Sequence, residues 1–76
     1  MTQYFKTHIK GDFPMFYKGN NREILHYRED TGEWVTTSYN DWNHFKNHIK
    51  SWKRDLIELP TEEELEKELM MLELTS

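Results

Sequence analysis

The chain has 76 residues, a net charge of −4, eleven aromatic residues and no cysteine. This length allows one small domain spanning residues 1–76, which buries only about 60% of the surface of its unfolded chain and depends on large side chains for its core. The composition excludes a disulfide framework and a thiolate metal site, and no apolar run approaches the ~20 residues of a membrane span.

The first half of the chain predicts an antiparallel β-meander of three to four short strands within residues 3–39. Apolar and polar residues alternate, as in half-buried strands, in residues 4–10, 13–18, 22–28 and 33–39. Turns are expected at residues 11–12, 19–21 and 29–32, because glycine and asparagine tolerate positive φ. Short turns between neighbouring strands imply an antiparallel order.

Residues 40–59 predict one amphipathic helix. Six apolar side chains at helical spacing fall within an arc of ~100°, and we assign them to the core: Trp42, Phe45, Ile49, Trp52, Leu56 and Leu59. Ser38 and Asp41 resemble a capping box at the start of this helix. Pro60 ends it, because proline lacks the N–H that a helix interior needs.

A second, acidic helix is expected over residues 61–74. Thr61 and Glu64 form a Thr-x-x-Glu capping box at its start, and three glutamates crowd the first turn, where the helix dipole favours negative charge. The seam that faces the core consists of Leu65, Leu69 and Leu72. Together these elements predict an α+β fold: a meander, an amphipathic helix and an acidic C-terminal helix.

One flank of the predicted helix 40–59 is basic, and it carries Lys46, Lys50, Lys53 and Arg54. Such a flank can contact phosphates, so nucleic-acid binding is the first alternative function. Aromatic residues of the sheet that could stack on bases are Tyr4, Phe16 and Tyr27. The acidic net charge and the absence of a helix-turn-helix, zinc-finger or RNP-type motif make nucleic acid the less favoured partner.

The opposite flank carries His44 and His48, whose spacing of four residues places two imidazoles on one helix face for one metal ion. Asp55 lies about 10 Å further along the helix, too far to be a third ligand. We therefore predict no metal and no cofactor, with this pair as the weak metal candidate. A polar site around His26 and these two histidines is the enzymatic alternative. The chain has no phosphate loop, nucleophile elbow or cysteine nucleophile, so we predict a protein without catalytic activity.

The acidic helix also carries apolar residues outside its leucine seam. Met70, Met71 and Leu74 project to other sides of the helix, and methionine suits adaptable contacts. We predict a partner-binding surface formed by these residues and Glu66, with the basic flank of residues 46–54 as a second contact region. The partner is a protein, or a second copy of the chain in a homodimer through this helix. A second alternative is DNA mimicry, in which the glutamate row imitates phosphates.

The short strands, the aromatic hairpin and the Thr-Glu-Glu-Glu start of the acidic helix at residues 61–64 resemble small accessory proteins of bacterial viruses. No named family lends site residues to this chain. The resemblance implies a non-catalytic inhibitor or adaptor that docks on a larger host protein. Residues 1–12 lack the apolar segment of a signal peptide, so we expect a cytoplasmic protein, in the host cytoplasm if its origin is viral.

Overall fold

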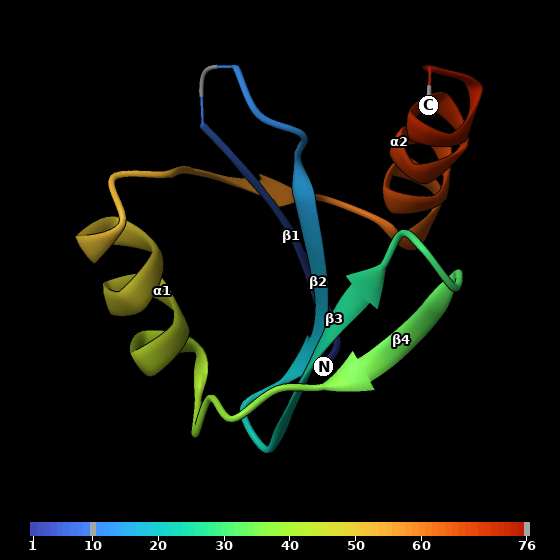
Figure 1. Ribbon diagram of the computed structural model, residues 1–76. Helices are drawn as coiled ribbons and strands as arrows, with labels where there is room; N and C mark the ends of the chain where they lie inside the picture. The colour runs from blue at the N-terminus through green and yellow to red at the C-terminus, as the bar shows by residue number, and fades with distance from the viewer. Residues whose placement is uncertain (10, 76) are drawn as a thin grey trace.

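The computed structural model describes residues 1–9 and 11–75. Its elements follow in the order β1 (Gln3–His8), β2 (Met15–Asn20), β3 (Glu23–Arg28), β4 (Glu33–Thr36), α1 (Trp42–Ser51), β5 (Asp55–Leu59) and α2 (Glu62–Thr75). The strands form one antiparallel sheet in the order β4-β3-β2-β1-β5. Figure 1 shows α1 on one side of this sheet and α2 on the other. The predicted α+β class, a meander followed by helices, is confirmed.

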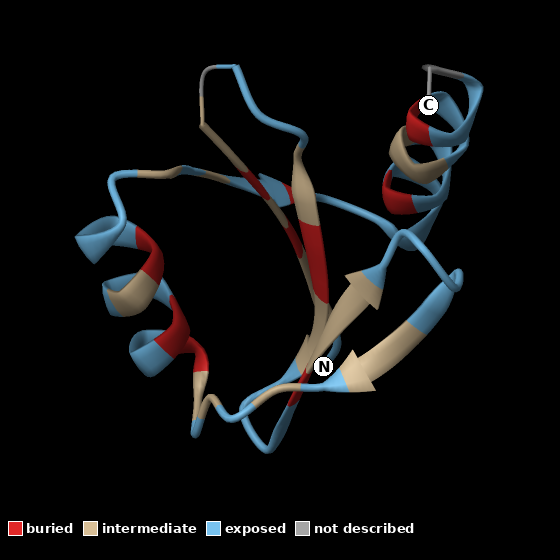
Figure 2. Cartoon of the chain, in the orientation of Figure 1, coloured by how far each residue is buried: buried red, intermediate tan, exposed pale blue. Residues whose placement is uncertain are grey.

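The sheet separates two hydrophobic cores. The core under α1 contains Phe5, Tyr17, Ile24, Trp42, Phe45 and Ile49. The core under α2 contains Phe16, Leu59, Leu65 and Leu72. Phe16 and Tyr17 are neighbours in β2 and enter different cores, as the pleat of a strand requires. The buried residues lie on strands of the sheet and on the helix faces turned to it (Figure 2), so each helix covers one face.

Helix α1 is shorter than the sequence predicts, and the predicted helix over residues 40–59 is wrong beyond Ser51. The helix stops in a Schellman motif, in which Lys53 adopts the left-handed φ of 57°. The N–H groups of Lys53 and Arg54 donate back to carbonyls of the last turn at 3.0 and 3.2 Å. Glycine usually fills this position, so a lysine there gave no sequence signal for the end of the helix.

The chain after α1 forms the edge strand β5 instead of continuing the helix. Leu56 packs against the α1 core and Leu59 enters the α2 core, which is the alternation of a strand. β5 pairs with β1 in a register that sets Leu59 opposite Tyr4. This pairing satisfies backbone groups of β1 that would otherwise need water or another partner. Trp52, which we assigned to the core, lies beyond the helix end and is 51% exposed.

One predicted turn lies where the sequence places it, and another is shifted. The β3–β4 hairpin forms at residues 29–32 as predicted: Gly32 has a φ of 72°, and its N–H donates to the carbonyl of Arg28 at 2.7 Å. The β2–β3 turn falls at residues 21–22, slightly later than expected. The reason is that Gly19 belongs to strand β2 and takes part in its pairing with β3.

Polar side chains cap both helices. Asp41, rather than Ser38, caps α1, because its Oδ1 accepts the N–H of His44 at 2.8 Å. At the start of α2, Thr61 Oγ1 accepts the N–H of Glu64 at 3.2 Å, as the sequence predicts. The two caps mark where each helix begins.

Tyr17 is a phenol buried under α1, and only 3% of its surface is exposed. Its hydroxyl contacts the sulfur of Met15 at 4.0 Å, a weak acceptor. Burial raises the pKa of Tyr17 from 10.0 to about 12; the nearby Tyr39 adds to this increase and Arg54 opposes it. Ionisation of Tyr17 is therefore less favourable in the folded chain than in the unfolded chain.

We expect the protein to lose stability between pH 10 and 12. Because the pKa of Tyr17 is higher in the folded state, its contribution is complete below pH 10 and disappears as the pH rises through 12. The loss should amount to about 3 kcal/mol in the free energy of unfolding, measured by urea denaturation at successive pH values. Tyr17→Phe should flatten this decline. An equally steep decline in the variant would assign the effect to other groups.

Candidate protein-binding surface

Helix α2 turns a leucine seam to the sheet and leaves other apolar side chains outside. Leu65 and Leu72 are buried, whereas the exposed fractions are 63% for Met70, 59% for Met71 and 81% for Leu74. Glu66, Met70 and Leu74 follow at intervals of four residues and therefore form one stripe along the helix. We call this stripe, together with Met71 on its flank, the outer face of α2. The structure thus places these four predicted site residues on one exposed helix surface.

Polar contacts lie on both flanks of the leucine seam of α2. Glu68 Oε1 lies 3.2 Å from Lys6 Nζ on β1. On the other flank, the hydroxyl of Tyr27 on β3 donates to Glu73 Oε1 at 3.4 Å. Partly exposed contacts of this kind contribute little stability. Like the leucine seam, however, they indicate which side of the helix faces outward.

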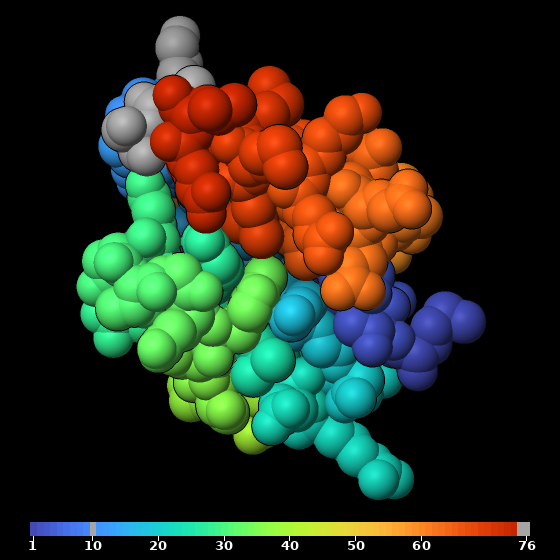
Figure 3. Space-filling view, turned by 90° about the vertical axis from the view of Figure 1, so that its right-hand side faces the viewer, coloured from blue at the N-terminus to red at the C-terminus, as the bar shows by residue number. Residues whose placement is uncertain are grey.

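A hollow of about 290 Å³ opens at the C-terminal end of α2. Its apolar lining comes from Phe13, Pro14, Met15, Phe16, Tyr27 and Leu72. Phe13 falls within the predicted strand of residues 13–18, but it precedes β2 and is 58% exposed. Figure 3 shows this side of the molecule, with α2 in orange and red lying above the green β3–β4 hairpin. None of the residues that line this hollow belongs to the outer face of α2, so the two are separate features of the surface.

Negative charge predominates on helix α2. Helix α2 carries six glutamates and one lysine, a net charge of −5. Glu68 and Glu73 are engaged with the sheet, whereas the glutamates at residues 62–64 and Glu66 are exposed. A partner that covers the outer face of α2 therefore meets carboxylates along its border.

The predicted basic flank of α1 is divided in the structure. Lys46, Lys50 and Lys53 are exposed, but the side chain of Arg54 is only 9% exposed. Its Nε donates to Thr7 Oγ1 at 3.2 Å, and its Nη1 lies 3.8 Å from a carboxylate oxygen of Asp12. Arg54, which directly precedes β5, is thus held against β1 instead of extending a phosphate-binding face. Phe16, a candidate for stacking on bases, is 1% exposed beneath α2.

His44 and His48 gather around Tyr39. The hydroxyl of Tyr39 lies 2.8 Å from His48 Nδ1, and the backbone N–H of Asn40 donates to His44 Nδ1 at 3.2 Å. The ring of Trp52 packs on His48 with 4.0 Å between centroids. In residues 1–9 and 11–75, no group of three or more histidine, cysteine, aspartate or glutamate residues could hold a metal ion. The two histidines therefore pack in a cluster with the aromatic rings of Tyr39 and Trp52. The sequence did not predict this cluster, because we assigned Trp52 to the core.

His26 lies in strand β3 beside Tyr17, with 5.1 Å between the ring centroids. Burial lowers the pKa of His26 below 6.5, and the nearby Arg28 adds to this effect. The rings of His44 and His48 contact Tyr39 instead. Of the three histidines of the enzymatic alternative, two therefore share Tyr39, whereas His26 contacts Tyr17.

No protein-family model matches this chain, and neither a curated protein nor a solved structure matches it. Within the part of the chain that the structure describes, no helix has both the length and the apolar character needed to cross a membrane. The chain's own surfaces are therefore what indicates a function.

Proposed function

We propose that this chain is a non-catalytic protein-binding domain that docks on a larger protein through the outer face of α2, as an inhibitor or adaptor. The observation that carries this proposal is the exposure of Met70, Met71 and Leu74 on a helix whose core-facing seam is already filled. Covering large apolar side chains releases free energy in proportion to the area removed from water. Anchors spaced four residues apart suit a helix that lies in an apolar groove.

The partner's groove should be bordered by lysine or arginine. The net charge of −5 on α2 favours a basic border, and complementary charges accelerate association and fix orientation. A symmetric homodimer through α2 would bring two such acidic helices together, so we assign the surface to a different protein. We place this docking in the cytoplasm, or the host cytoplasm for a viral chain, since the absence of cysteine suits a reducing compartment.

The double variant Met70→Glu/Leu74→Glu should abolish docking without unfolding the protein. Both side chains are exposed, so the free energy of unfolding should change by less than ~0.5 kcal/mol. Charged groups are unfavourable in an apolar groove, so capture of the partner should fall at least ~30-fold, as for loss of an interface hot spot. The measurement is quantitative capture of host proteins by tagged wild type and variant, with a photo-crosslinking residue at position 66 to mark the bound protein.

The matched control is Thr36→Glu/Ser38→Glu, which makes the same change in net charge at exposed positions of β4 and of the segment that follows it. This control should capture the partner as well as wild type does. Equal capture by Met70→Glu/Leu74→Glu and wild type would reject the outer face of α2 as the docking surface. Sedimentation that shows a dimer dispersed by this double variant would instead identify a second copy of the chain as the occupant.

A further inference from the structure

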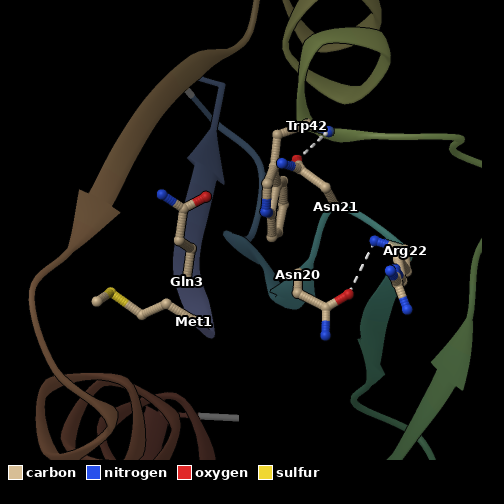
Figure 4. A pocket seen from close by; sticks show the side chains of 6 residues that line it. All are labelled: Met1, Gln3, Asn20, Asn21, Arg22 and Trp42. Atoms are coloured by element: carbon tan, nitrogen blue, oxygen red, sulfur yellow. Dashed lines mark hydrogen bonds between the residues drawn. The ribbon is translucent and has the colours of Figure 1, made fainter.

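A hollow of about 540 Å³ lies where the start of β1, the β2–β3 turn and the start of α1 meet. Figure 4 shows the residues that line it: Met1, Gln3, Asn20, Asn21, Arg22 and Trp42. An adjoining hollow of about 490 Å³ shares Gln3, Asn21 and Trp42 and continues along the first turn of α1 to Lys46. We call the two together the Trp42 hollow. Its lining contains no residue of α2.

The Trp42 hollow offers mainly hydrogen-bond donors. Asn20 Oδ1 accepts the N–H groups of Arg22 and Glu23 at 2.8 and 3.1 Å. Asn21 Oδ1 accepts the backbone N–H of Trp42 at 3.4 Å. Because both amide oxygens are engaged, the amide NH₂ groups are the parts of these side chains left for a ligand. The guanidinium of Arg22 adds positive charge, as does the N-terminal end of α1.

The indole N–H of Trp42 is the observation that points to a ligand. Trp42 is 5% exposed, and its Nε1 is buried with no hydrogen-bond partner among the residues that the structure describes. A buried N–H without an acceptor is unfavourable, and such groups are rare in folded proteins. In Figure 4 the nitrogen-bearing edge of the indole faces the side of the hollow where Gln3 lies. For an acceptor to reach the buried N–H, the side chains around it, Gln3 among them, must move aside.

We propose that the Trp42 hollow binds a carboxylate. One carboxylate oxygen of the ligand would accept a hydrogen bond from the indole N–H of Trp42. The other oxygen would accept hydrogen bonds from the amide NH₂ groups of Asn20 and Asn21. Arg22 and Lys46 would balance the negative charge of the ligand. Asp41 also lines the hollow, where its Oδ1 accepts the N–H of His44 at 2.8 Å. Its negative charge opposes a doubly charged phosphate more than a singly charged carboxylate. The carboxylate can belong to a small acid or to the C-terminus of a peptide.

The test follows the three tryptophan indole N–H resonances of the ¹⁵N-labelled chain, with Trp42→Phe used only to assign its signal. Sodium acetate is added at constant ionic strength, with sodium chloride as the matched salt. The Trp42 resonance should move downfield and saturate, while those of Trp34 and Trp52 stay in place. Arg22→Gln should weaken binding about tenfold, as expected for loss of a charge-assisted hydrogen bond. Lys50→Gln removes the same charge outside the hollow and should bind like wild type.

Two further ligands identify the source of the carboxylate. These are acetyl-Gly-Ala with a free C-terminus and the same peptide as its C-terminal amide. Saturation by acetate and the free peptide indicates a small-acid site, and saturation by the free peptide alone indicates a site for chain termini. No saturable movement of the Trp42 resonance, equal movement of all three indoles, binding of the amide, or a response to phosphate without a response to carboxylates would each overturn the proposal. Met70→Glu/Leu74→Glu should not change this titration, which keeps it independent of the docking proposal.

Discussion

Replacing Phe45 with alanine should lower the free energy of unfolding by about 3–5 kcal/mol. Phe45 is 0% exposed, and its ring lies 4.6 Å from Tyr17, 5.3 Å from Trp42 and 5.8 Å from Phe5, measured between centroids. It therefore joins α1 to β1 and β2 at the centre of one core. Domains are stable by only about 5–15 kcal/mol, so we expect this cavity to remove a large part of the stability.

Urea denaturation followed by circular dichroism measures this loss, provided that the slope against urea stays constant. Phe13→Ala is the matched control, because it removes the same ring from a position that is 58% exposed. The control should shift the midpoint only slightly. Equal midpoints for the two variants would contradict the placement of Phe45 at the centre of the α1 core.

Gly19→Ala should destabilise the protein by about 2–4 kcal/mol, through a clash of backbone with side chain. Gly19 has a φ of 149°, a conformation that side chains disfavour. A Cβ built at this position meets the carbonyl oxygen of Glu23, and it lies 3.0 Å from Cα of Ile24. Both obstacles are backbone atoms of β3, so the pairing of β2 with β3 must shift to admit the methyl group.

Gly11→Ala is the control that separates the two contributions to the loss in Gly19→Ala: the steric clash and the cost of placing alanine at a positive φ. Gly11 also has a positive φ, 88°, but a Cβ there meets nothing within 4 Å. Its substitution should therefore cost about 1–2 kcal/mol, the penalty for the left-handed region alone. Thermal and urea unfolding of the two variants compare them directly. A loss in Gly19→Ala no greater than in Gly11→Ala would show that the pairing of β2 with β3 accommodates the methyl group.

The two proposed sites lie on different parts of the molecule and can be tested separately. The outer face of α2 belongs to the helix that covers one side of the sheet, and the Trp42 hollow lies at the start of α1 on the other side (Figures 1 and 4). One surface is apolar with an acidic border, whereas the other offers donors and positive charge. The first suits a groove on a partner protein, and the second suits a small charged group. A variant that damages one surface should therefore leave the other intact.

The sequence predicted the features that depend on residues close together in the chain. The glycine of the 29–32 hairpin, the Thr61 cap and the seam of Leu65 and Leu72 are local signals, and the structure bears them out. Helical spacing also predicted that Met70 projects away from that seam. Such features follow from backbone conformation and side-chain direction within one or two turns.

The ends of α1 and the identity of β5 depended on contacts between distant residues. Leu56 and Leu59 fit a helical period as well as a strand period, so their spacing did not decide between the two. The edge of β1 decided it by pairing with β5, and the exposure of Trp52 followed from the earlier end of the helix. The pattern of apolar and polar residues shows neither that one edge of β1 is free to pair with β5 nor that Lys53 adopts a left-handed backbone conformation.

By itself, the sequence determined a small α+β domain with an acidic helix that carries an apolar outer face. The tertiary structure decided that the two helices cover opposite faces of the sheet, that Arg54 is enclosed beside Thr7, and that the Trp42 hollow exists. The physical reason is separation along the chain. Periodicity reports which side of an element is apolar, whereas a cavity and its donors arise only when the sheet order brings residues 3, 20–22 and 42 together.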